Sequence, residues 1–108
     1  MKTYKSQIQI LLGLALLLAF STVAAAQDTP ADVFKAKCAM CHGPAGNAST
    51  PMAKNMGLKP LTDPEVQKMS NADLTALITN GKGKMPAMKG KLTDAQISDL
   101  AKYIHTLK

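Results

Sequence analysis

The pentapeptide Cys38-Ala39-Met40-Cys41-His42 constrains this chain of 108 residues more than any other feature. On a helix, side chains three positions apart are neighbours, with Cβ atoms roughly 5–6 Å apart. The two thiols would then share one face, where they can add across the two vinyl groups of a single haem. His42 would follow beneath the ring, where an imidazole nitrogen can bind the iron. The motif therefore predicts one covalently attached haem c, bound through Cys38 and Cys41, with His42 as the proximal iron ligand.

Three other interpretations of the two cysteines remain open. A thiol–disulfide exchange pair of the thioredoxin kind needs a neighbouring βαβ pattern, and the sequence has none. A structural zinc usually needs four Cys or His ligands, whereas this chain offers Cys38, Cys41, His42 and the distant His105. A simple disulfide would leave the histidine beside the second cysteine unexplained. The haem is the interpretation that accounts for all three residues of the motif.

Residues 1–26 have the pattern of a secretory signal peptide. Lys2 and Lys5 precede an apolar run over 8–20, and three alanines precede Gln27. The apolar run is shorter than the roughly 20 residues that a membrane-spanning helix needs, although an uncleaved anchor is the alternative. We therefore predict cleavage after residue 26, export to the periplasm, and one functional domain over residues 27–108.

The predicted domain is poor in aromatic residues. Removing residues 1–26 leaves Phe34 and Tyr103 as its aromatic side chains. A domain of this size is close to the limit at which a hydrophobic core alone gives stability. A haem bound by two thioethers would fill the core and also act as a covalent staple.

Hydrophobic spacing and capping residues predict helices and no strands. The expected helices run from Pro30 through the cysteine motif, over 52–57 as a short turn, over 63–69, over 71–80, and from Asp94 towards Leu107. Three begin with capping boxes, at Thr29–Asp32, Ser70–Asp73 and Thr93–Gln96. The predicted fold is all-α, with three to five short helices wrapped around one covalently attached haem.

A methionine thioether is the expected second axial ligand, because it suits an electron-transfer haem. Six methionines follow residue 26, at positions 40, 52, 56, 69, 85 and 88. Met40 lies within the attachment motif, on the wrong side of the ring, and Met69 is expected in the core. Met52 and Met56 remain within reach of the iron.

Met85 is the predicted distal ligand because of its neighbours. Gly81 and Gly83 permit close approach of the backbone, and Pro86 stiffens the chain just after the sulfur. Met88, in the same loop, is the second candidate. The alternative for each is that it fills a gap in the core.

The cysteine motif, the Gly-Lys-Gly-Lys-Met-Pro-Ala loop over 81–87 and the Leu-Thr-Asp start of the last helix together resemble small class I bacterial cytochromes c. The resemblance covers essentially all of residues 27–108. It implies that the first and last helices cross near Phe34 and Tyr103, and that one haem edge is exposed. It also implies that a proline carbonyl, with Pro51 the nearest match, holds the imidazole of His42.

The chain has 13 lysines, no arginine, 7 acidic residues and a net charge of +6. Six lysines lie close to the predicted ligands, namely Lys35, Lys37, Lys82, Lys84, Lys89 and Lys91. A cationic rim of this kind would steer redox proteins with acidic docking surfaces towards the haem edge. Without arginine or stacking aromatics, nucleic-acid binding is not expected. His105, near a helix C-terminus, is not expected to bind a metal.

Together these features predict an exported, soluble and monomeric electron carrier with one haem and no enzymatic activity. The alternative is a haem enzyme, such as a small peroxidase, or a gas-binding sensor. Either would need an open or weakly held sixth position at the iron.

Overall fold

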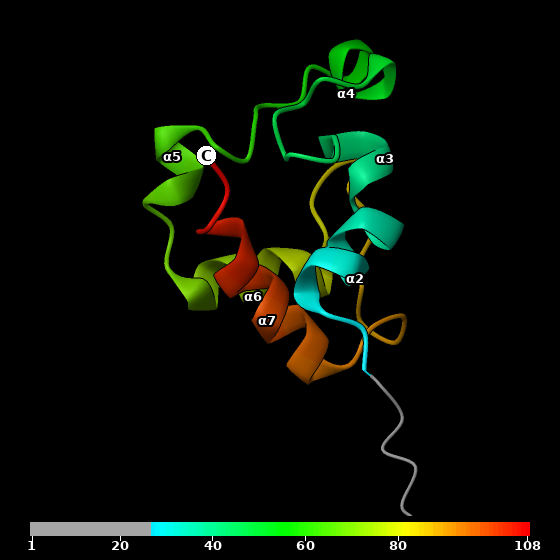
Figure 1. Cartoon of the computed structure of the whole chain (residues 1–108), viewed down its shortest axis with the longest axis vertical. Coiled ribbons are helices and arrows are strands. Elements are labelled where there is room, and N and C mark those ends of the chain that lie inside the picture. The colour runs from blue at the N-terminus through cyan, green and yellow to red at the C-terminus, as the bar shows by residue number, and fades with distance from the viewer. Residues whose placement is uncertain (1–26) are drawn as a thin grey trace, which may run out of the picture.

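A computed structural model describes residues 27–108 as an all-α structure (Figure 1). Its helices are α2 (Pro30–Lys37), α3 (Ala39–His42), α4 (Pro51–Met56), α5 (Pro64–Gln67), α6 (Asn71–Asn80) and α7 (Asp94–Ile104). Two isolated β-bridges are the only extended pairing within residues 27–108. The predicted signal peptide, residues 1–26, lies outside the described residues. In residues 27–108, no helix is both long and apolar enough to cross a membrane.

Side-chain caps start the helices where the sequence predicts them. At α2, Asp32 N donates to Thr29 Oγ1 and Thr29 N donates to the Asp32 carboxylate, each at 3.2 Å. Thr93 and Gln96 form the same reciprocal pair at α7. Ser70 accepts from the backbone N–H of Asp73 at 3.0 Å, but the reciprocal bond is not formed there. Two of the three predicted capping boxes are therefore complete, and the third is a simple N-cap.

The first predicted helix is divided at Cys38. The φ angle of Cys38 is −116°, well away from the usual helical value of about −63°, so α2 ends there and α3 begins. Backbone hydrogen bonds nevertheless run through the junction, from Cys38 N to Phe34 O and from His42 N to Cys38 O. Because of this break, residues 27–108 contain six helices rather than the three to five expected.

The core forms where α7 packs against both α2 and α6 (Figure 1). The predicted apolar stripe of α7 is confirmed, because four of its side chains are buried: Ile97, Leu100, Ala101 and Ile104. Phe34 meets this stripe from α2 and is 1% exposed. The expected crossing of the first and last helices is therefore present.

The segment between α3 and α6 encloses the space next to this core. Figure 1 shows α5 on one side and α3 with α4 on the other, joined by an extended stretch of chain. The side-chain amide of Gln67 donates to Leu61 O at 2.8 Å and to Ile104 O at 3.0 Å. This amide ties the extended stretch to the C-terminal end of α7 and fixes one wall of the space.

Candidate haem site

An apolar cavity opens between α2 and α3 on one side and α5, α6 and α7 on the other. It encloses about 1070 Å³ of empty space when its open mouth is included. Small-molecule sites in proteins are typically concave and lined mostly by apolar side chains, as this cavity is. All four predicted ligands line it: Cys38, Cys41, His42 and Met85. The structure therefore brings together residues that the sequence separates by more than forty positions.

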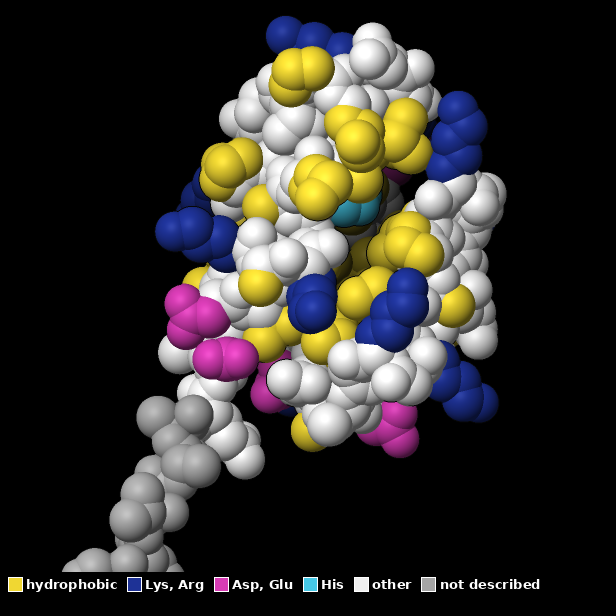
Figure 2. Space-filling view, turned by 90° about the vertical axis from the view of Figure 1, so that its right-hand side faces the viewer, with side chains coloured by type: hydrophobic (Ala, Val, Ile, Leu, Met, Phe, Trp, Pro, Cys, Tyr) yellow, Lys and Arg dark blue, Asp and Glu magenta, His cyan; other side chains and the backbone are white. Residues whose placement is uncertain are grey.

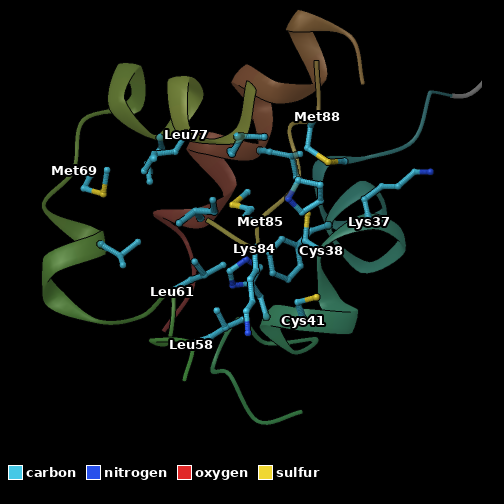
Figure 3. Close-up of a pocket in the computed structure, with 18 of the residues that line it drawn as sticks. Lys37, Cys38, Cys41, Leu58, Leu61, Met69, Leu77, Lys84, Met85 and Met88 are labelled. Carbon is cyan, nitrogen blue, oxygen red and sulfur yellow. The ribbon is translucent and has the colours of Figure 1, made fainter. Parts of the chain in front are cut away.

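The two cysteines stand on the wall formed by α2 and α3 (Figure 3). Both are half-buried free thiols. Burial, with a smaller contribution from the charge of Cys41, raises the pKa of the Cys38 thiol to about 11. Thiolates are the species that attack disulfides and bind zinc, so a thiol that stays protonated at neutral pH disfavours both roles.

His42 closes α3 and faces the same cavity. Its Nδ1 atom is buried without a hydrogen-bond partner among the described residues. The carbonyl contact with Pro51 that the resemblance implied is therefore absent. Burial also lowers the pKa of the His42 imidazole, which favours the neutral ring that binds metals. A buried ring nitrogen without a partner is costly, so Nδ1 is an unsatisfied group on a residue that lines the cavity.

Met85 reaches the cavity from a tight turn. Two backbone hydrogen bonds close this turn, from Lys82 N to Met85 O at 3.1 Å and from Met85 N to Lys82 O at 3.0 Å. A Cβ atom on Gly81 would lie 2.5 Å from Met85 O, so only glycine permits this approach. Figure 3 shows the Met85 side chain near the middle of the cavity, between the cysteines and Leu61.

The other methionines fall into two groups. Met56, Met69 and Met88 also line the cavity, whereas Met40 and Met52 do not. Met88 is 7% exposed and belongs to the core cluster, and its backbone N–H donates to Ile78 O. Its side chain is therefore already engaged in packing. Met69, expected in the core, is half-buried on the cavity wall.

Several wall residues were missed by the sequence analysis. Leu58, Leu61 and Val66 come from α5 and the irregular stretch before it. Hydrophobic periodicity predicts a buried face only on regular elements, so it gives no signal on such a stretch. The leucines of 58–61 interrupt an otherwise polar loop, and that interruption is the signal that could have identified them.

The mouth of the cavity is cationic. Figure 2 shows a hollow with a histidine ring inside it, hydrophobic side chains around it and lysine side chains beside it. Lys37 and Lys84 are among the residues that line the cavity. Lys82, Lys89 and Lys91 are exposed in the loop that carries Met85. Two of the six lysines that the sequence predicts near the site therefore lie at the cavity itself.

The residues fit a covalently held haem. Two half-buried thiols, one imidazole and one thioether line the same large apolar space. Within residues 27–108, no group of three or more His, Cys, Asp or Glu side chains could hold a metal ion by itself. The donors present are those that bind haem iron together with the porphyrin.

Comparison with known proteins identifies the class. The family model described as "Cytochrome C oxidase, cbb3-type, subunit III" matches residues 25–104, and the chain belongs to this family of c-type cytochrome domains. It is also similar to cytochrome c6 of Nostoc sp., with 42% identity over 88% of this chain and 86% of the relative. Cytochrome c6 of Porphyra purpurea is 40% identical over 75% of this chain and 71% of the relative.

Two further comparisons place the domain in context. The cbb3-type oxidase subunit CcoP of Azospirillum brasilense is 39% identical over 81% of this chain, which spans 30% of that longer relative. The solved structure of the KustC0563 c-type cytochrome matches with a TM-score of 0.68 and 26% identity, over 75% of this chain and 99% of that one. The cofactor is accordingly a covalently attached haem c with its iron, and the predicted cytochrome c fold is confirmed.

Proposed function

We propose that the protein is a monohaem electron carrier, in which Cys38 and Cys41 bind the haem and His42 and Met85 bind its iron. The bound haem would accept and release one electron without making or breaking a bond in a substrate. The observation that carries the proposal is the convergence of all four side chains on one apolar cavity. Relatives named as cytochrome c6 support it.

The axial pair explains why a carrier is favoured over an enzyme. A thioether from Met85 would occupy the position where a peroxidase or gas sensor binds its ligand. Three further lining methionines and the leucines of the wall would limit the access of water to the iron. With little water near the iron, few water molecules must reorient when the charge of the iron changes. This lowers the barrier to electron transfer. The same exclusion of water and of other small molecules disfavours reactions of a substrate at the iron.

The location and boundaries belong to the same proposal. We infer that residues 1–26 are removed as a signal peptide and that residues 27–108 act in the periplasm as a soluble monomer. The charged start, apolar run and small residues before Gln27 support cleavage. Covalent haem attachment needs reduced thiols, and both cysteines are free in the structure.

The proposed partners are redox proteins with acidic docking surfaces. Lys82, Lys84, Lys89 and Lys91 are all exposed in the loop around Met85. Among residues 27–108, the ion pairs formed are Lys59–Glu65 and Lys102–Asp99, so these four lysines are free to meet a partner. Steering by such a patch changes association rates by about 10–10³-fold.

A redox titration of the purified protein tests the proposed function. A carrier should take up one electron per haem, return fully to its first spectrum on reoxidation, and show no catalytic turnover of added hydrogen peroxide. Met85→Ala, which opens the sixth position, is the matched control and should begin to consume peroxide. Catalytic loss of peroxide with the unaltered protein would instead support the enzyme.

A further inference from the structure

A second sulfur lies against the attachment cysteine. Cys41 Sγ and Met52 Sδ are 3.4 Å apart, a contact between α3 and the first turn of α4. Met52 is 42% exposed and lies outside the cavity that Cys41 lines. The Met52 side chain is therefore accessible to solvent while its sulfur contacts the sulfur that would carry the haem.

The same segment holds Cys41 at a second point. Thr50 Oγ1 donates to Cys41 O at 3.0 Å and accepts from Ala53 N at 3.1 Å, which caps α4. Ala53 is the one buried residue of α4. The first turn of α4 is thus attached to Cys41 by few contacts, and a chemical change at Met52 acts directly on them.

Met52 has the exposure that methionine oxidation requires. In this reaction the sulfur lone pair attacks one oxygen of hydrogen peroxide, an S–O bond forms and the O–O bond breaks. The departing hydroxide takes the remaining proton and leaves as water, so the thioether loses two electrons and the peroxide gains them. The product is methionine sulfoxide, a polar side chain that methionine sulfoxide reductases convert back.

We propose that Met52 is a reversible oxidation site, and that its conversion to the sulfoxide lowers the reduction potential of the haem. The proposal rests on the proposed function, because it requires Cys41 to carry the haem. A polar S=O group and the water it attracts would replace an apolar contact beside the Cys41 sulfur. The ferric haem carries one more positive charge than the ferrous haem, so a more polar, more hydrated edge stabilises it and lowers the potential.

Met40 provides the matched control. It is 74% exposed and lies on the same helix as Cys41, so peroxide reaches it at least as easily as Met52. Among the described residues it forms no side-chain hydrogen bond to Cys41, whereas the Met52 sulfur lies 3.4 Å from Cys41 Sγ. Its oxidation should therefore leave the potential unchanged.

The experiment treats the ferric holoprotein with increasing hydrogen peroxide and follows two signals. Peptide mass mapping locates each added oxygen, and voltammetry measures the potential. We expect oxygen on Met40 and Met52 before the half-buried Met56 and Met69 or the buried Met88. The potential should fall in step with Met52 oxidation and recover after treatment with sulfoxide reductases.

Variants separate the two exposed sites. Met40→Leu should keep the full fall in potential, and Met52→Leu should abolish it while Met40 still oxidises. An unchanged potential with Met52 fully oxidised, or an equal fall in Met52→Leu, would overturn the proposal. The absorption band of the ferric iron–methionine bond is recorded throughout and must persist. Its disappearance would show that the potential changed because Met85 no longer binds the iron. Absence of covalent haem from the untreated protein would contradict the proposed function itself, which is a different result.

Discussion

The ring centroids of Phe34 and Tyr103 lie 5.4 Å apart, with their planes inclined at 54°. This tilted pair joins α2 to α7, and it unites the two aromatic side chains of the described residues. Both helices also contribute to the cavity, through Phe34, Leu100 and Ile104. The aromatic pair therefore links the closure of the fold to the shape of the haem site.

Replacement of Phe34 should be among the most destabilising changes in the domain. Phe34→Ala removes a side chain that is almost fully buried, and such changes cost about 3–5 kcal/mol of unfolding free energy. Tyr103→Phe keeps the ring and should stay within about 0.5 kcal/mol. Denaturant unfolding of the holoprotein measures the unfolding free energy of both variants. Similar losses of unfolding free energy in the two would show that contact between the two rings does not hold α2 against α7.

Gly81 should be needed for the position of Met85. In Gly81→Ala the new Cβ would lie 2.5 Å from Met85 O and 2.7 Å from Ala87 N, so the loop that carries Met85 must move. We expect the ferric iron–methionine band to weaken or disappear. Gly83→Ala is the control, since Gly83 also has a positive φ but nothing lies within 4 Å of its Cβ position. If backbone strain from an alanine at positive φ were the whole cause, the iron–methionine band would weaken equally in Gly81→Ala and Gly83→Ala.

The carboxyl of Asp32 should make the stability of the domain depend on pH in the acid range. Its hydrogen bonds with the Thr29 side chain and backbone lower the pKa of the carboxyl below its ordinary value of 3.8. Because the folded-state pKa is depressed, the stabilisation is present above pH 3.8 and is lost as pH falls through the folded-state value. Asp32→Asn should remove this component of the pH profile. Unfolding free energies of both proteins between pH 6 and the acid limit, about pH 2, measure the difference. If the unfolding free energies of the two proteins change in parallel with pH, the Asp32 carboxylate contributes nothing to the pH dependence of stability.

The lysines of the Met85 loop should govern association with anionic redox partners. Reversal of Lys84 and Lys89 to Glu should slow electron exchange at low salt, within the steering range of about 10–10³-fold, and the difference should shrink as salt rises. Reversal of Lys102 and Lys108 changes the net charge equally, and the exposed pair of Lys102 with Asp99 has little effect on stability. Stopped-flow measurements of the electron-exchange rate at several ionic strengths compare the two double variants. Equal slowing would indicate that net charge, rather than a docking patch, sets the rate.

Much of this architecture could be predicted from local chemistry. Thr29, Ser70 and Thr93 mark three helix starts because a hydroxyl that caps backbone N–H groups is a local requirement. The stripe of α7 follows from its 3.6-residue period. The attachment motif specifies the cofactor because two thiols and an imidazole at that spacing suit one haem.

The remaining features depend on tertiary packing. Helix propensity does not predict the division of the first helix at Cys38, where φ is −116°. The wall formed by Leu58 and Leu61 lies on irregular chain, held by the Gln67 amide across to Ile104. The missing partner of His42 Nδ1 could not be foreseen either, since it depends on where Pro51 lies after folding.

The distinction between Met85 and Met88 is central to the account. Both side chains line the cavity, but Met88 belongs to the buried core cluster whereas Met85 is only half-buried beside it. Met88→Ala should therefore cost about 2–5 kcal/mol of unfolding free energy and keep the ferric iron–methionine band. Met85→Ala should abolish the band and cost less stability. The opposite pattern would make Met88 the ligand.

The most direct measurement is the optical spectrum of the reduced protein with and without carbon monoxide. With His42 and Met85 both bound, carbon monoxide should leave the spectrum of the unaltered protein unchanged. The Met85→Ala variant should bind it readily, because its sixth position is open. Ready binding by the unaltered protein would contradict the account and point to a haem with a vacant or weakly held site.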